Sequence, residues 1–363
     1  MPAWLRRYPL TLLAFSFLAL YGIAASTGML APGPRPTGTP STPTTPPVAG
    51  SISDPIPRMA IVYDLPGRGS AGFNELAWEG ARRAADKLSA ELKEVTAEPG
   101  DTDADREARL KELAEARYSP IFVIGSTYAG PVAKVAPKYP STWFAIVDDG
   151  SVDAPNVIGI QFHDEQGSFL VGAAAALTSK TGKVGFIGAV QVPLFQTFEA
   201  GFTAGARAAN QHVKVTVAYL SRSTDDTGPG DPATVRNAAL GMYGAGVDVI
   251  FGVVGGSSDV VIQAAHDRGL WAIGVISDQY VLADPSLRGA ILTSMLKRAD
   301  VATYLIAMEV ANGIPKDGNN VFGVGPGGVG YSNSGGFVDP IKAQLDAFAA
   351  RIASGEILVP TTP

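Results

Sequence analysis

The sequence contains no cysteine, so a disulfide, a thiolate metal site and a cysteine nucleophile are all excluded. Its three histidines (His163, His212 and His266) are scattered and form no HxH or HExxH pattern, which argues against a histidine-based metal site. No run of Lys or Arg occurs and the formal net charge is −6, so a basic face for nucleic acid is not expected. Thiol chemistry is therefore excluded, and metal and nucleic-acid binding are disfavoured.

The chain does contain enough apolar sequence for a well-packed body with a lightly charged surface. It has 363 residues, of which 46% are hydrophobic and 17% are charged. This length is sufficient for about two domains.

The N-terminal segment has the features of an export signal. Arg6 and Arg7 precede an apolar run over residues 10–25, which ends in small residues. Because a bilayer span needs roughly 20 apolar residues, we expect residues 1–26 to be either a signal peptide or an uncleaved membrane anchor. Residues 27–57 are rich in Pro, Thr, Gly and Ser, which predicts an extended linker. The rest of the chain is therefore expected outside the cytoplasm, periplasmic or at the cell surface.

From Arg58 onward, apolar strand-like runs alternate with helical segments, which is typical of parallel sheets with crossover helices. The expected strands are 59–63, 92–96, 121–125, 143–147, 157–162, 183–187, 213–219, 247–253, 271–275 and 291–294. The expected helices are 74–88, 105–117, 129–138, 166–179, 196–210, 232–243, 258–268, 298–312 and 340–353. So many strands exceed one doubly wound domain. We predict an α/β fold of two Rossmann-like lobes: 58–163 plus about 297–318, and 164–296 plus about 319–355.

The first strand, loop and helix carry the most informative group of side chains. Asp64 follows the strand, a glycine-containing loop comes next, and Phe73 and Asn74 open the helix. Ligands of open α/β sheets bind at the carboxyl ends of strands, so an acid, an aromatic ring and an amide would meet in one crevice. This set suits a polar, ring-bearing molecule. Equally, Asn74 could cap the helix while Phe73 packs as a hydrophobic staple.

Four further positions follow predicted strands. Asp148 ends the fourth strand, where a solvated turn is the alternative. Phe198 lies one helical turn before Phe202; we expect Phe202 in the core and Phe198 at a cleft between the lobes. Gly255 lies in a glycine turn that opens a helix, without a dinucleotide or P-loop pattern. Lys297 ends the last strand, where the chain crosses between lobes; a surface lysine is the alternative.

Several segments together resemble one protein family. They are GFNELAWEG, KYPSTWFAIVDD, NVIGIQFHDEQGSFLVGAAAALTSKTGKVGFIGAV, FEAGFTAG, GVDVIFGVVGG, IGVISDQ and TSMLKR. On these motifs the chain resembles the basic-membrane-protein family of ABC-transporter substrate-binding proteins, whose best-understood members bind purine nucleosides. The resemblance implies a type I periplasmic-binding-protein fold, in which two lobes with three crossovers enclose the ligand in a hinge-closing cleft.

The same resemblance implies the roles of individual residues. Asp64, Phe73, Asn74 and Asp148 would hold the base, and Phe198 would stack opposite Phe73. Gly255 would contact the ligand through its backbone, and Lys297 would donate to sugar hydroxyls.

One position departs from the family, which reads IGVDxDQ where this chain reads IGVISDQ. Ile276 replaces the aspartate that accepts the sugar hydroxyls, and Asp278 is a candidate replacement two residues on. Relatives are often anchored by an acylated cysteine after the signal, which this chain lacks.

The leading hypothesis is a solute-binding protein that captures a purine nucleoside or related heterocycle and delivers it to an ABC permease. Two alternatives within the binding class are a membrane-tethered sensor and a binder of free nucleobases, the second because of Ile276. An enzyme is disfavoured, since the sequence has no dinucleotide fingerprint, nucleophile elbow or metal cluster. We therefore expect no catalytic residue, no metal and no cofactor.

Overall fold

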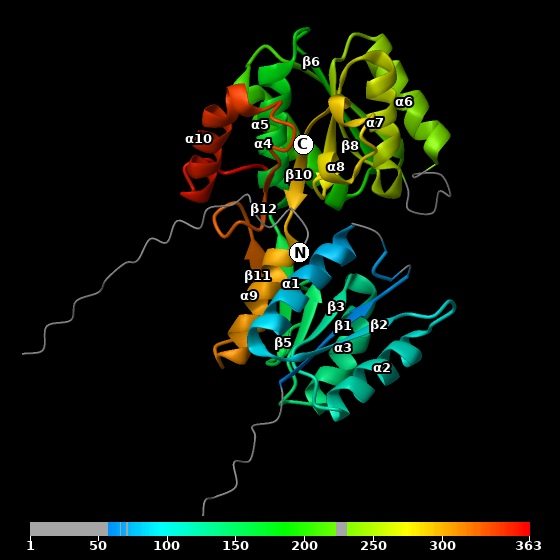
Figure 1. Cartoon of the computed structure of the whole chain (residues 1–363), viewed down its shortest axis with the longest axis vertical. Helices are drawn as coiled ribbons and strands as arrows, with labels where there is room; N and C mark the ends of the chain where they lie inside the picture. Colours follow the sequence, from blue (N-terminus) through cyan, green and yellow to red (C-terminus); the bar gives the residue numbers. More distant parts are fainter. Residues whose placement is uncertain (1–56, 66, 70–71, 223–230) are drawn as a thin grey trace, which may run out of the picture. The chain divides into compact units, whose positions relative to one another are not determined.

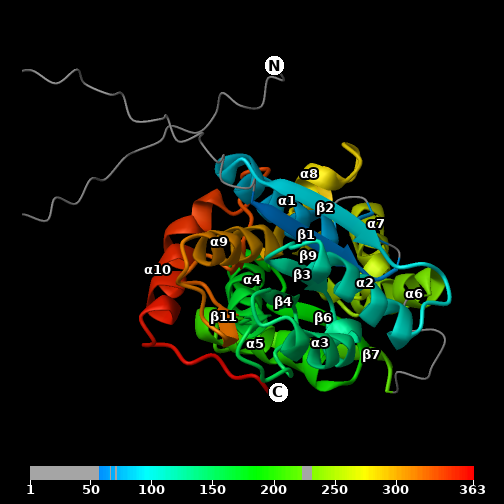
Figure 2. The ribbon, with the colours of Figure 1, turned by 90° about the horizontal axis from the view of Figure 1, so that it is seen from below.

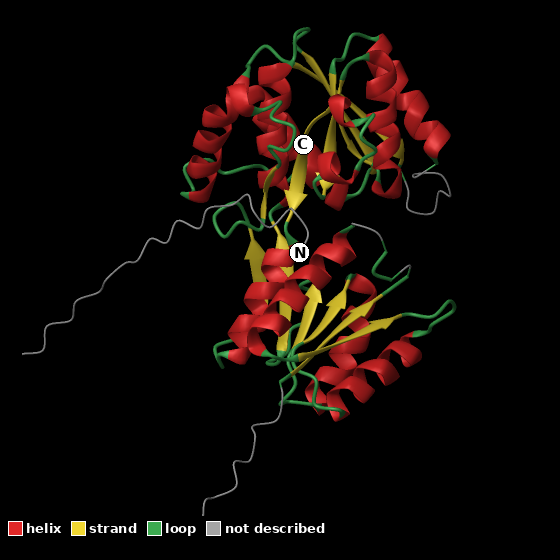
Figure 3. Cartoon of the chain, in the orientation of Figure 1, coloured by secondary structure: helices red, strands yellow, loops and turns green. Residues whose placement is uncertain are grey.

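The computed structural model describes residues 57–65, 67–69, 72–222 and 231–363. The signal or anchor expected at residues 1–26, and the linker expected at 27–57 apart from Pro57, lie outside the described residues. The described body contains two six-stranded sheets, each with helices on both faces (Figure 1, Figure 3). No helix among the described residues has the length and apolar content needed to span a bilayer.

The first sheet has the strand order β11-β5-β4-β3-β1-β2, and all its strands run parallel. Its central strands β3 and β4 are buried at every position, as a sheet covered on both faces requires. Its strands are β1 (Arg58–Tyr63), β2 (Glu91–Thr96), β3 (Ile121–Ile124), β4 (Phe144–Val147), β5 (Val157–Phe162) and β11 (Gly318–Phe322). Its helices are α1 (Phe73–Leu88), α2 (Asp103–Glu115), α3 (Ala129–Val135) and α9 (Ala299–Ala311). Helices α1 and α9 pack side by side, as do α2 and α3 (Figure 2).

The second sheet has the order β12-β10-β9-β8-β6-β7, and only β12 runs antiparallel to its neighbour. Its strands are β6 (Lys183–Val190), β7 (Lys214–Ser221), β8 (Val249–Val253), β9 (Trp271–Ile276), β10 (Ile291–Lys297) and β12 (Val329–Tyr331). Its helices are α4 (Asp164–Thr178), α5 (Pro193–Ala209), α6 (Pro232–Gly244), α7 (Ser258–Arg268), α8 (Gln279–Leu282) and α10 (Lys342–Ala353).

The chain passes between the two sheets three times. The crossings follow β5, β10 and β11, so the two-lobed α/β fold with three crossovers predicted from the sequence is confirmed. One boundary differs from the sequence prediction, which gave residues from about 319 to the second lobe. In the structure, β11 pairs with β5 as far as Phe322 and so belongs to the first lobe. The sequence prediction missed this strand because it is a short, half-exposed edge strand without the apolar run that marks the central strands.

Helices α4 and α5 approach each other unusually closely. A Cβ atom at Gly201 would lie 2.2 Å from the Glu165 carbonyl oxygen, and one at Gly205 would lie 1.9 Å from that of Phe169. These two glycines therefore allow the close packing of α4 and α5. Phe202, on the same helix, is fully buried in the core, as expected.

Candidate functional site

A cavity of about 610 Å³ lies between the two lobes, at the carboxyl ends of the strands. Phe73 and Asp148 line it from the first lobe, after β1 and β4. The second lobe contributes α5 with Phe195 and Phe198, the turns after β8 and β9, and Lys297 at the end of β10. Ligands of open parallel sheets bind in such a crevice, because a loop follows the carboxyl end of each strand and its side chains can face the ligand.

Lys297 forms an ion-pair cluster at the base of the cavity. Its Nζ atom lies 2.7 Å from Asp148 Oδ1 and 3.1 Å from Asp164 Oδ2. The residue is 3% exposed and Asp164 is 4% exposed, whereas the Asp148 side chain is 33% exposed. The cluster joins the end of β4 in the first lobe to the end of β10 in the second, so Asp148 and Lys297 link the two lobes directly.

Burial determines the protonation of this cluster. It raises the pKa of Asp164 to about 6, although the Lys297 ammonium acts in the opposite direction. Burial alone would lower the pKa of Lys297, but the carboxylates of Asp164 and Asp148 outweigh it and raise that pKa. The second oxygen of Asp164, Oδ1, is buried without a hydrogen-bond partner among the described residues. The Lys297 pKa is therefore raised by its two carboxylate partners, and burial makes Asp164 ionise at a higher pH than an exposed aspartate does.

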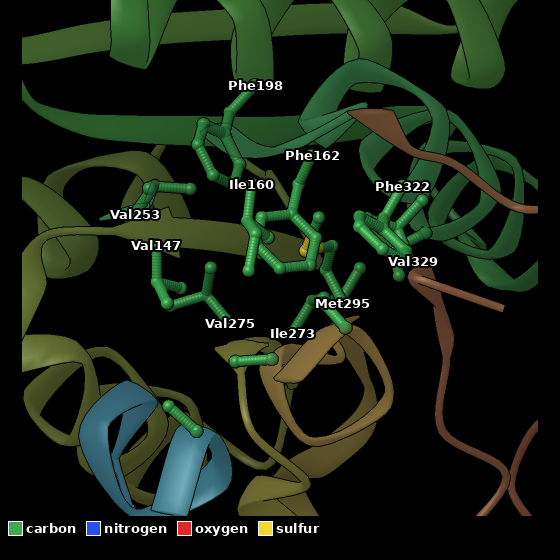
Figure 4. Packing of buried hydrophobic residues seen from close by; sticks show 14 of the residues in the cluster. Val147, Ile160, Phe162, Phe198, Val253, Ile273, Val275, Met295, Phe322 and Val329 are labelled. Carbon is green, nitrogen blue, oxygen red and sulfur yellow. The ribbon is translucent and has the colours of Figure 1, made fainter. Parts of the chain in front are cut away.

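Aromatic rings surround the cluster. The Lys297 Nζ atom lies 5.3 Å from the ring centre of Phe73 and 5.1 Å from that of Phe162. These two rings pack edge to face, with centres 6.0 Å apart. Figure 4 shows Phe162 and Phe198 in one apolar group with Val147, Val253 and Val275. The cavity therefore has an apolar, aromatic wall beside the Lys297 ion-pair cluster, which suits a flat ring with polar edges.

The cavity brings together five of the predicted site residues: Phe73, Asp148, Phe198, Gly255 and Lys297. The other three, Asp64, Asn74 and Asp278, do not line it. Asp64 accepts hydrogen bonds from Arg106 and from the Leu65 backbone N–H.

Asn74 donates through Nδ2 to the Gly67 carbonyl at 2.7 Å. It therefore does not cap α1, whose N-cap is Gly72 and has no side-chain cap. Asp278 accepts from the hydroxyls of Ser332 at 2.7 Å and Ser334 at 2.6 Å, and it lines a smaller neighbouring cavity.

Two residues at the cavity share an uncommon backbone conformation. Asp148, which directly follows β4, and Ile276, the last residue of β9, each have φ of +71°. Aspartate tolerates this left-handed region, but a β-branched side chain there is an outlier whose cost is about 1–3 kcal/mol. Ile276 therefore holds an apolar side chain beside the cavity at a position where the backbone favours Asp, Asn or Gly.

The sequence analysis missed Phe162, Asp164 and Asp259. Phe162 and Asp164 immediately precede and follow the first crossover, next to His163. Their signal in the sequence was the placement of an aromatic and an acid at a predicted lobe boundary. Asp259 lines the cavity from the first turn of α7.

Comparison with known proteins identifies the family. Residues 60–362 match the model of the family described as "ABC transporter substrate-binding protein PnrA-like". The chain belongs to this family. It is 32% identical over 321 residues to the "CD4+ T-cell-stimulating antigen" of Listeria monocytogenes, covering 84% of this chain and 88% of the relative. It is 29% identical to the "ABC transporter nucleoside-binding protein BmpA" of Lactococcus lactis, covering 84% and 89%.

Solved structures agree on the fold. An ABC transporter solute-binding protein from Aeropyrum pernix superposes with a TM-score of 0.65 at 27% identity, covering 84% of this chain and 94% of that chain. A solute-binding protein from Conexibacter woesei superposes with a TM-score of 0.70 at 22% identity, covering 84% and 99%, and supports the fold alone. The chain is thus an ABC transporter substrate-binding protein with the type I periplasmic-binding-protein fold.

Across residues 57–65, 67–69, 72–222 and 231–363, no cluster of three or more His, Asp or Glu side chains is arranged to hold a metal ion.

Proposed function

We propose that this protein is the extracytoplasmic component of an ABC importer and that it captures a purine nucleoside or a related heterocycle. The observation that carries the proposal is the cavity itself, in which Phe73 and Phe198 provide an aromatic wall beside Asp148 and Lys297. A purine ring gains by stacking on such walls while its edges hydrogen-bond to the polar groups. The nucleoside named for the Lactococcus lactis relative supports this ligand class.

In this proposal, Phe73 and Phe198 contact the ring from the two lobes. Asp148 accepts from a ring N–H or exocyclic amine, because only one of its oxygens is held by Lys297. Lys297 donates to the ligand beside its carboxylate partners, and the Gly255 backbone allows close approach. Binding then draws the lobes together, which presents one closed shape to a membrane permease.

Asp64, Asn74 and Asp278 are also proposed ligand contacts: Asp64 and Asn74 from their place after β1 and from the family resemblance, and Asp278 as a replacement for the acid that Ile276 displaces. Each has to exchange its present partner for the ligand. For Asp278 this means giving up two serine hydroxyls, a larger cost than for Asn74, which gives up one carbonyl contact.

Free nucleobases are a second candidate ligand, favoured by Ile276. An apolar side chain at this wall leaves a ribose hydroxyl without an acceptor, at a cost of roughly 1–3 kcal/mol per buried unsatisfied group. A base without its sugar avoids this cost.

We also propose that the N-terminal segment, residues 1–26, exports the protein and can hold it at the membrane through the linker. The matched family acts as transporter binding proteins, and this chain has no cysteine for a lipid anchor.

The test is calorimetric titration of the ligand-stripped full chain with adenosine, guanosine, inosine, adenine, guanine and hypoxanthine. Binding at micromolar concentration or tighter is expected for at least one of them. Phe73→Ala should weaken it at least tenfold, whereas Trp78→Ala, on the same helix but outside the cavity, should not. Failure of all six ligands to bind would refute the purine assignment.

A further inference from the structure

Asp259 differs from every other carboxylate near the cavity. It is the second residue of α7, it lines the cavity, and it is exposed. Asp148 and Asp164 are paired with Lys297. Asp278 accepts from two serine hydroxyls through Oδ2, and its Oδ1 is buried without a hydrogen-bond partner among the described residues. No ion pair or side-chain hydrogen bond to Asp259 exists within the described part of the chain. It is therefore an acceptor facing the cavity with both oxygens available.

Asp259 lies at a helix N-terminus of the kind that binds anions, and its negative charge disfavours a second anion there. Gly255, with φ of +61°, and Gly256 turn the chain from β8 into α7, and both line the cavity. Such a glycine turn at a helix N-terminus attracts phosphates through its backbone N–H groups and the helix dipole. A carboxylate in the first helical turn already interacts favourably with the helix dipole, and its charge repels a second anion. The Ser258 hydroxyl donates to the Gly255 carbonyl at 2.9 Å.

The charges lining the cavity point the same way. The cation Lys297 is already balanced by Asp148 and by the buried Asp164, so Asp259 adds a negative charge without a counterion. The cavity therefore favours uncharged or cationic ligands that carry hydrogen-bond donors, and it disfavours phosphorylated ones.

Asp259 also lies on the same lobe as Ile276. Strands β8 and β9 are adjacent and parallel, and the turns that follow them both line the cavity. Ile276 has no acceptor, and Asp278 does not line this cavity; its Oδ2 atom accepts from Ser332 and Ser334. Asp259 is therefore the carboxylate with which the second lobe lines the cavity. We propose that Asp259 is a specificity-determining residue that accepts a hydroxyl or amino donor of the ligand in place of an acid at position 276. This inference rests on the proposed function, because the probes are purines.

The test compares calorimetric affinities of the full-length protein and two variants for the nucleoside that the wild type binds best. Asp259→Ala should weaken binding by about tenfold or more, the effect of losing a hydrogen bond to a charged acceptor. Asp267→Ala is the control, since it removes an acid from the last turn of the same helix, where it pairs with Arg236 outside the cavity. The control should keep its affinity within about twofold, a change well below that of one hydrogen bond.

Three outcomes are decisive. Loss of affinity in Asp259→Ala but not in the control supports the inference. A lower unfolding temperature with less than a tenfold change in affinity would assign Asp259 to helix stabilisation alone and overturn it. If the wild type binds a free base but no nucleoside, the same comparison is made with that base. If the wild type binds no purine, the proposed function fails first, and this inference fails with it.

Discussion

Substitution of Asp164 by asparagine should change how the stability of the protein depends on pH. Burial raises the pKa of Asp164 to about 6 from an ordinary value of 3.8. The folded state therefore binds this proton more tightly than the unfolded state does, and this carboxyl lowers stability as pH rises from about 4 to 6. A difference of about two pKa units corresponds to roughly 3 kcal/mol. In Asp164→Asn that cost is absent, while Lys297 keeps its 2.7 Å partner Asp148.

The measurement is the free energy of unfolding, by urea titration, of the wild type and of Asp164→Asn at a series of pH values from 4 to 7.5. The difference between the two proteins should shift in favour of the variant by roughly 3 kcal/mol across this range and then stay constant. Asp86→Asn is the control, because it removes an exposed acid that has only a surface partner, Arg82. A difference between wild type and Asp164→Asn that stays flat within about 1 kcal/mol would refute the assignment of a buried, late-ionising carboxyl.

Three further predictions concern packing and selectivity. Gly205→Ala should destabilise the protein by about 1–3 kcal/mol or more, because the new Cβ meets the Phe169 carbonyl; Gly241→Ala, in open space on α6, should instead stabilise it slightly. Thermal unfolding separates the two, and equal effects would contradict the close packing of α4 and α5. Ile276→Asp should raise the affinity for inosine relative to hypoxanthine by about tenfold in calorimetry; an unchanged ratio would show that the sugar does not reach this wall. A nucleoside 5′-monophosphate should bind at least about tenfold more weakly than its nucleoside, less so at high salt, and equal binding would contradict the charge argument built on Asp259.

The central strands could be predicted because each is marked by a continuous apolar run in its own sequence. A run such as residues 144–147 is apolar at every position, and in the structure every residue of β4 is buried between helices. The resulting strand set agrees with the sequence prediction to within a few residues at each end.

The later strands were harder to predict for a physical reason. Strand β11 is half exposed and contains two asparagines, and β12 spans only three residues. Their sequences carry no strand pattern of their own, and they become strands by pairing with β5 and β10, which is a tertiary effect.

In the candidate site, the positions of some residues could be predicted from the sequence, but their contacts could not. Residues directly after a strand, such as Asp148 and Lys297, could be placed at the cavity because the topology brings strand ends together. The ion pair between the Lys297 Nζ atom and Asp148 could not be predicted, because it depends on how the two lobes face each other. Asp64 and Asp278 also follow strands, yet each found a protein partner nearby, and the sequence does not reveal which polar residue is already satisfied.

Lys297 joins the two lobes next to two of the crossovers. Its carboxylate partners belong to two different connections: Asp148 directly follows β4 of the first lobe, and Asp164 begins α4 just after the first crossover. Lys297 itself ends β10, where the second crossover starts. In the proposed binding mode, a ligand that accepts a hydrogen bond from Lys297 or donates one to Asp148 changes an ion-pair cluster that joins the two lobes next to these crossovers. Because Asp164 is buried and has an unpaired oxygen, weakening its contact with Lys297 is costly unless the lobes rearrange or the carboxyl takes up a proton. In the proposed binding mode, the free-energy change at this cluster therefore falls on residues beside the first and second crossovers, where a closing motion would act.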